Sequence, residues 1–148
     1  MARLVASFLG SGLILGRIRG ADAGSGTVAA AAALLFAYWL PPVWGRAGAF
    51  VLALVAGYWA VSSLRFARDD PAWVVIDEAA GMFLASIGLG LLGLVTAFVV
   101  FRVADIGKKI APGVARAERL PGATGIMADD LVAGLYGLAA GWLVQSLL

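Results

Sequence analysis

Hydrophobic residues gather into long stretches along this chain, and most charged residues lie in the short segments between them. Three stretches predict helices that cross a membrane: residues 28–44, 47–64 and 131–148. Each has 17 or 18 residues, close to the shortest helix that crosses an apolar bilayer core of about 30 Å. Only a tight turn at residues 41–46 separates the first two stretches, so we expect them to form an antiparallel hairpin.

The apolar stretch at residues 79–101 allows two topologies. Its 23 residues could cross the membrane once, or form two half-length helices that fold back at Gly88-Leu89-Gly90. A single crossing divides the basic residues into five (Arg3, Arg17, Arg19, Arg65, Arg68) and six (Arg46, Arg102, Lys108, Lys109, Arg116, Arg119). A hairpin leaves only Arg46 on one side and ten on the other, which is the asymmetry expected when basic loops stay in the cytoplasm. We therefore favour a re-entrant helical hairpin and keep the single crossing as the alternative.

The N-terminal residues 4–16 are mostly apolar but too few to cross a bilayer. We interpret them as an interfacial or re-entrant segment, although a signal peptide has a similar pattern. The length of 148 residues predicts a single domain, 1–148. Together these patterns predict an all-α fold, a polytopic integral membrane helical bundle with three spans, a re-entrant hairpin and an N-terminal interfacial segment.

The composition agrees with a membrane protein and narrows the chemistry. Hydrophobic residues make up 62% of the chain, the mean hydropathy is +0.96, and only 14% of residues are charged. The chain has neither Cys nor His, which excludes Cys and His nucleophiles, a Ser-His-Asp triad and a His-based zinc site. The net charge of +2 is small and the basic residues flank membrane segments, so no nucleic-acid partner is indicated.

Carboxylates stand beside the apolar stretches, where ionisable groups are costly and are usually functional. They are Asp77, Glu78, Asp105, Asp129 and Asp130. Arg102, Asp105 and Lys108 are spaced three apart, so they share one face of a helix. Carboxylate oxygens suit Mg²⁺, and Arg and Lys suit phosphate. Each of these residues could instead have a purely structural role. Acidic residues also cap helix N-termini, and Arg–Asp ion pairs also occur at helix ends at the membrane interface.

Two glycine-containing segments could present backbone amides to a phosphate. Residues 24–27 (Gly-Ser-Gly-Thr) precede the first span, where a helix N-terminus favours anions. Residues 121–128 precede the acidic pair Asp129-Asp130 and are expected to form a loop. A simple turn with a helix cap is the alternative at both places.

Three motifs in this order resemble the phosphatidylglycerophosphatase A family over nearly the whole chain. They are Asp77-Glu78-x-x-Gly81, Phe101-Arg102-x-x-Asp105-Ile106-x-Lys108 and Gly125-Ile126-Met127-x-Asp129-Asp130-x-x-Ala133-Gly134. The resemblance implies a Mg²⁺-dependent enzyme of the bacterial cytoplasmic (inner) membrane. It would hydrolyse the anionic phospholipid phosphatidylglycerophosphate to phosphatidylglycerol and phosphate, at the cytoplasmic face.

On this basis each candidate residue is assigned a role. The expected Mg²⁺ ligands are Asp77, Glu78, Asp129 and Asp130. Asp77, Asp105 and Asp129 are expected to be catalytic, with Asp105 as a further ligand or the general base. Arg102, Lys108, Thr27 and Gly26 are expected to bind the substrate phosphate. The attacking group is expected to be water activated by the metal, with an Asp nucleophile as the alternative.

Two other functions stay open from the residues alone. A small transporter or ion-coupling subunit also carries acids and broken helices inside a membrane. A non-catalytic relative could bind anionic lipid through its basic loops. The sequence does not indicate an oligomeric state.

Overall fold

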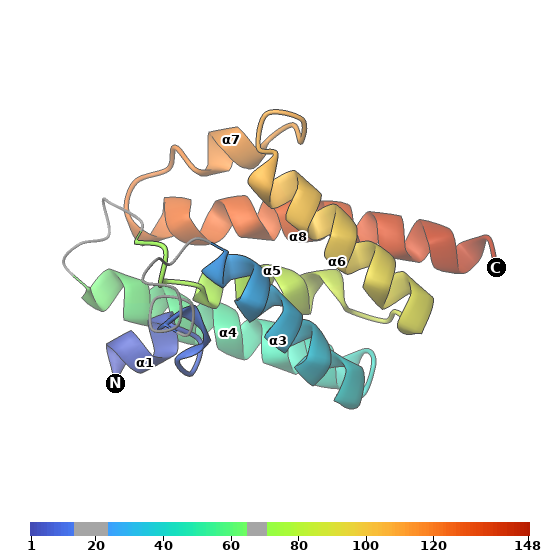
Figure 1. The fold of residues 1–148 in the computed structure, drawn as a ribbon, viewed down its shortest axis with the longest axis horizontal. Helices are drawn as coiled ribbons and strands as arrows, with labels where there is room; N and C mark the ends of the chain where they lie inside the picture. The colour runs from blue at the N-terminus through green and yellow to red at the C-terminus, as the bar shows by residue number, and fades with distance from the viewer. Residues whose placement is uncertain (14–23, 65–70) are drawn as a thin grey trace.

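Helices form all the regular structure in the residues that the structure, a computed structural model, describes: 1–13, 24–64 and 71–148 (Figure 1). They are α1 (Ala2–Ala6), a 3₁₀ turn (Ser11–Leu13), α3 (Ser25–Trp39), α4 (Trp44–Ser63), α5 (Ile76–Ala85), α6 (Leu91–Ile106), α7 (Val114–Ala117) and α8 (Ala123–Ser146). The prediction of an all-α fold is confirmed. Four of the basic residues that favour the hairpin, Arg17, Arg19, Arg65 and Arg68, lie outside the described ranges.

Two of these helices are long and apolar enough to cross a membrane, α4 with 20 residues and α8 with 24. The predicted first span at residues 28–44 is wrong in its bounds. Helix α3 begins at Ser25 and ends at Trp39, because Leu40 is extended ahead of Pro41. Its 15 residues extend about 22 Å at 1.5 Å per residue, short of an apolar core of about 30 Å. The arrangement of three spans therefore stays a prediction.

The stretch at 79–101 is broken into two helices, as the hairpin requires. Helix α5 ends at Ala85, Gly88 has a φ of +75°, and α6 begins at Leu91. Helix α6 returns toward the start of α5, where its Arg102 donates a hydrogen bond to Thr27 on α3. The helical break is as predicted, whereas its place in a membrane stays a prediction.

A buried arginine fixes the turn of this hairpin. The guanidinium of Arg46 donates to the carbonyl oxygens of Ala37 (2.7 Å), Ser86 (2.8 Å) and Leu89 (2.6 Å), and Arg46 is only 3% exposed. Its side chain thus joins the end of α3 to the α5–α6 turn. On the other side of the turn, Trp142 of α8 donates to the carbonyl oxygen of Ile87 at 3.1 Å.

Helix α8 begins eight residues earlier than predicted. It starts at Ala123 instead of residue 131, so Asp129 and Asp130 lie in its second turn. The expected loop at 121–128 is wrong, because Ala123–Ala128 are helical. Gly125 packs so tightly on the chain that a methyl group there would overlap the carbonyl oxygen of Leu120.

The N-terminal segment is not one continuous helix. After α1 the chain turns at Phe8 and Leu9, which both have positive φ, and then forms the 3₁₀ turn. The amide of Val75 donates to the carbonyl oxygen of Ala6 at 2.9 Å, so the segment lies against the start of α5. The last residues of the predicted 4–16 segment, 14–16, lie outside the described residues.

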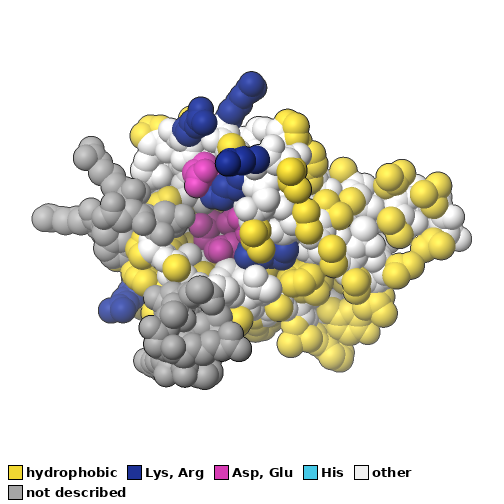
Figure 2. Space-filling model, turned by 45° about the horizontal axis from the view of Figure 1, so that its top comes forward, with side chains coloured by type: hydrophobic (Ala, Val, Ile, Leu, Met, Phe, Trp, Pro, Cys, Tyr) yellow, Lys and Arg dark blue, Asp and Glu magenta, His cyan; other side chains and the backbone are white. Residues whose placement is uncertain are grey.

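Large apolar side chains cover the outer faces of several helices. Those more than half exposed include Leu52 and Val55 on α4, Val99 and Val103 on α6, and Leu143 on α8. Figure 2 shows apolar side chains over much of one end of the molecule, away from the acidic and basic groups. Extended apolar surface of this kind suits contact with lipid.

Candidate functional site

Three carboxylates from two helices meet inside the bundle. Asp77 and Glu78 lie in the first turn of α5, and Asp130 lies in the second turn of α8. One oxygen of each lies within 4.8 Å of the others. Asp77 is 5% exposed and Asp130 is 3% exposed. Motifs that are more than 50 residues apart in the sequence therefore form one acidic cluster.

Two glycines allow the helices to approach closely enough to form this cluster. A Cβ atom at Gly81 would lie 2.6 Å from the carbonyl oxygen of Asp130. A Cβ atom at Gly134 would lie 2.6 Å from the carbonyl oxygen of Gly81. The backbones of α5 and α8 are therefore in contact about one turn from the acids, which gives a physical reason for both glycines in the motifs.

The cluster has carboxylate oxygens without a protein partner. Glu78 Oε2 and Asp130 Oδ1 are buried and accept no hydrogen bond from any described residue. Asp77 Oδ1 accepts one from the Glu78 amide at 3.1 Å. Buried carboxylates that face one another without donors are strongly unfavourable unless a cation neutralises them. A donor set made only of oxygens fits Mg²⁺.

Arg102 brings positive charge to the edge of the acidic cluster. It forms an ion pair with Asp105, and its Nη2 donates to Thr27 Oγ1 at 3.2 Å. Its buried Nε has no hydrogen-bond partner among the described residues. Asp105 lies close enough to Glu78 and Asp130 for its charge to act on both. An available guanidinium donor beside oxygen ligands suits a phosphate bound at the same place.

Gly26 makes room for this arrangement. A methyl group at Gly26 would overlap Glu78 Oε1 and would lie 3.3 Å from Arg102 Nη2. Gly26 and Thr27 lie in the first turn of α3. The structure thus places both predicted phosphate-binding residues beside the cluster, although the clearest requirement for Gly26 is space for Glu78.

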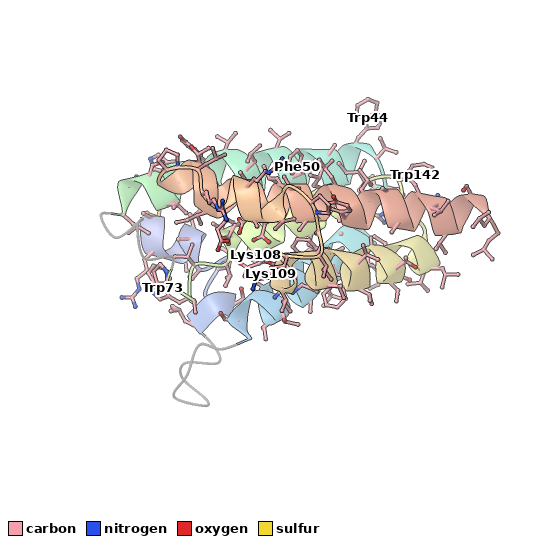
Figure 3. The ribbon with its side chains drawn as sticks, turned by 90° about the horizontal axis from the view of Figure 1, so that it is seen from above. Trp44, Phe50, Trp73, Lys108, Lys109 and Trp142 are labelled. Carbon is pink, nitrogen blue, oxygen red and sulfur yellow. The ribbon has the colours of Figure 1, made fainter. Side chains whose placement is uncertain are left out.

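Asp129 and Lys108 bond to each other beside the cluster. Lys108 is labelled in Figure 3. Its Nζ lies 2.7 Å from Asp129 Oδ2 and 2.8 Å from Glu118 Oε1. Burial by itself would lower the pKa of Lys108, but hydrogen bonds and attraction to the two carboxylates outweigh it, so the pKa is raised. Asp129 is consequently not among the three grouped carboxylates.

Glu118 is a residue that sequence reasoning did not find. It follows α7, its side chain is half exposed, and it binds Lys108. It belongs to none of the three motifs and stands alone among basic residues, so no spacing marks it. Figure 2 shows the acidic groups in a hollow framed by basic side chains, with Lys and Arg protruding above it.

Comparisons with known proteins agree with this site. The model of a family described as phosphatidylglycerophosphatase A matches residues 4–145. A Bacteroides thetaiotaomicron protein described as "Putative phosphatidylinositol-3-phosphatase" is 34% identical over 100 residues, which are 64% of this chain. The match covers 62% of that relative, so the chain spans less than two thirds of its length. No solved structure matches the chain.

Proposed function

Because the chain belongs to the phosphatidylglycerophosphatase A family, and so to the phosphatases of phospholipid metabolism, we propose that it hydrolyses phosphatidylglycerophosphate. The products are phosphatidylglycerol and phosphate, and the reaction requires Mg²⁺. The family favours an enzyme over a transporter subunit or a non-catalytic lipid-binding protein. The observation that carries the proposal is the acidic cluster with two unpartnered buried oxygens, next to an available guanidinium.

Asp77, Glu78 and Asp130 are the residues that would hold Mg²⁺. When bound, the metal supplies positive charge that stabilises the charge developing on the phosphate oxygens. Arg102 binds the phosphate through its free donor and so aligns the phosphorus beside the cluster. The Thr27 hydroxyl, which already bonds Arg102, limits the positions that the guanidinium can take.

The remaining step is transfer of one phosphoryl group to water. The oxygen of water bonds to phosphorus while the bond to the ester oxygen breaks, and the leaving alkoxide takes up a proton. Asp105, which Arg102 holds beside the cluster, would accept the proton that the attacking water loses. Asp129 stays a predicted ligand and catalytic residue. Its Oδ2 is bonded to Lys108, and that contact would have to break for this oxygen to become a ligand.

We also propose that the protein spans the bacterial cytoplasmic membrane several times, with α5 and α6 as a re-entrant hairpin. Two apolar helices of sufficient length and the apolar outer faces support this arrangement. The site then lies at the cytoplasmic face, where a lipid headgroup reaches it from the plane of the membrane.

A second candidate substrate is a phosphoinositide. The relative from Bacteroides is named for a phosphatase of phosphatidylinositol 3-phosphate, which is also a phosphomonoester on a lipid headgroup. The acidic cluster and Arg102 would serve either substrate. The two candidates differ in the headgroup, so the same assay with each lipid distinguishes them.

The test is phosphate release by the detergent-purified full chain, with Mg²⁺ and with excess chelator. Asp130→Asn keeps the size of the side chain and removes a charged ligand. We expect turnover to fall by about a hundredfold or more, on the order found when a group that stabilises transition-state charge is lost. Tryptophan fluorescence during heating checks that the variant is folded. Full turnover in excess chelator would show that the reaction does not need a metal ion. Near-normal turnover of the folded Asp130→Asn variant would show that the acidic cluster takes no part in the mechanism.

A further inference from the structure

A second hollow lies on the other side of Lys108, between the end of α6 and the start of α8. It has a volume of about 300 Å³, and four of its lining residues are basic. They are Lys108, Lys109, Arg116 and Arg119. The chain between α6 and α8 runs through residues 107–113 and returns through α7 and the residues after it. Basic residues before α7, within it and after it therefore line the same hollow. This basic hollow is separated from the acidic cluster by the ion pair between Lys108 and Asp129.

Most of the positive charge in the basic hollow is not neutralised. The ammonium of Lys108 forms ion pairs with Asp129 and Glu118. Lys109, Arg116 and Arg119 are exposed and form no ion pair with any residue that the structure describes. Glu118 is the one acid of this segment, and its carboxylate binds Lys108. Three cations are therefore available for an anion from outside the protein.

Exposed apolar side chains stand next to these cations. Ile106 and Ile110 are each 71% exposed, and both border the adjoining part of the surface together with Lys109 and Arg119. Figure 2 shows basic side chains projecting from this side of the molecule, with apolar ones among them. Basic side chains that can bind lipid phosphates, next to apolar side chains that can contact acyl chains, are typical of a surface that lies on a lipid membrane. A site for a soluble anion has no need of the isoleucines.

We propose that the basic hollow binds the headgroup of an anionic membrane phospholipid, separate from the lipid molecule at the acidic cluster. The phosphodiester of that lipid lies among Lys109, Arg116 and Arg119, and its acyl chains lie beside Ile106 and Ile110. The bound lipid would hold the segment between α6 and α8 against the membrane surface. The segment includes Glu118, which bonds to Lys108. Movement of the segment would therefore change the contact between Glu118 and Lys108, and with it the contact between Lys108 and Asp129. The proposal does not depend on which phosphomonoester the protein hydrolyses.

The expected effect follows from the charges. A basic residue near an anionic membrane surface contributes about 1 kcal/mol, which corresponds to roughly fivefold in affinity. Changing one of the three cations to glutamine should weaken lipid binding about fivefold. Changing all three should weaken it on the order of a hundredfold.

The experiment is native mass spectrometry of the detergent-purified full chain, titrated with phosphatidylserine. Phosphatidylserine carries a net negative charge and has no phosphomonoester to hydrolyse, so its binding can be read without turnover. Phosphatidylcholine with the same acyl chains is the zwitterionic comparison, and inorganic phosphate is added as a competitor. We expect saturable binding of phosphatidylserine that the K109Q/R116Q/R119Q variant loses.

Two control variants isolate the basic hollow. K109R/R116K/R119K keeps all three charges and should keep the binding. Arg3→Gln removes one exposed charge elsewhere, beside Trp73, and should leave the binding unchanged. Equal binding by the triple glutamine variant, or equal binding of phosphatidylcholine, would overturn the proposal. Displacement of the lipid by millimolar inorganic phosphate would instead mark a site for a soluble anion and would overturn it as well.

Discussion

Replacing Arg46 by methionine should destabilise the protein strongly without touching the acidic cluster. Methionine is similar in length but can donate none of the three hydrogen bonds to Ala37, Ser86 and Leu89. The carbonyl oxygens left behind belong to the end of α3 and to the α5–α6 turn. They are buried around a side chain that is 3% exposed, so water cannot readily replace the guanidinium.

The three hydrogen bonds of Arg46 determine how much free energy of unfolding the substitution removes. Hydrogen bonds to a charged donor contribute about 1.5–3 kcal/mol each, so three amount to roughly 5–9 kcal/mol. Burial of the guanidinium away from water costs several kcal/mol, which the substitution recovers. The difference leaves a loss of about 3 kcal/mol in the free energy of unfolding. In a chain of this size 1 kcal/mol shifts the melting temperature by about 2–4 °C, so we expect a fall of about 6–12 °C.

Tryptophan fluorescence during heating in detergent is a suitable measurement, because Trp142 contacts the same turn through the Ile87 carbonyl (Figure 3). Arg46→Lys is the matched control. It keeps the charge, but a single ammonium cannot reproduce the fork that reaches three acceptors, so it should recover only part of the loss. An Arg46→Met protein that melts within about 1 °C of the wild type would show that the three hydrogen bonds do not stabilise the fold. A Lys variant as stable as the wild type would show that charge alone matters.

Two further predictions concern the site. Gly81→Ala should push α5 from α8 at the Asp130 carbonyl, cost about 1–3 kcal/mol and weaken Mg²⁺-dependent phosphate release. Gly48→Ala, in α4 with nothing within 4 Å of the added carbon, should leave turnover unchanged and keep or slightly raise the melting temperature, because alanine favours a helix more than glycine does. Equal behaviour of the two variants would contradict the close approach of α5 and α8. Because the pKa of Lys108 is raised, its contribution to stability is fully present below the ordinary lysine value of 10.5 and is lost as pH rises through the higher folded value. The free energy of unfolding should therefore fall above about pH 10.5, and denaturant titrations of Lys108→Met should show a smaller alkaline fall.

The helical hairpin and the acidic motifs could be predicted because they follow from local patterns. The distribution of basic residues and the glycines at 88 and 90 pointed to a fold-back, and the described chain is broken there. The motifs placed acids at the ends of apolar stretches, and helices that pack side by side bring such ends together. Three of the four predicted metal ligands meet in the structure.

The partner of each acid could not be predicted, because it depends on where a helix begins. The sequence placed Asp129 and Asp130 between an expected loop at 121–128 and the start of a span, where both could turn toward one metal. Within α8, neighbouring residues point about 100° apart, so Asp130 faces α5 and Asp129 faces Lys108. The contacts of Arg46 could not be predicted for another reason. Its acceptors are backbone carbonyl oxygens, which every residue has, so the sequence does not mark them.

The division of the acidic cluster between α5 and α8 has a consequence for biogenesis. The ribosome makes Asp77 and Glu78 well before Asp130 and Gly134, so a nascent chain carries two of the three carboxylates of the cluster before the helix that covers them exists. Carboxylates of this kind resist transfer into lipid until a partner helix shields them. In the proposed membrane topology, the α5–α6 hairpin would then stay near the membrane surface until α8 is made and packs against it. A chain interrupted before α8 would be both inactive and poorly inserted, and cellular proteases could recognise it as incomplete.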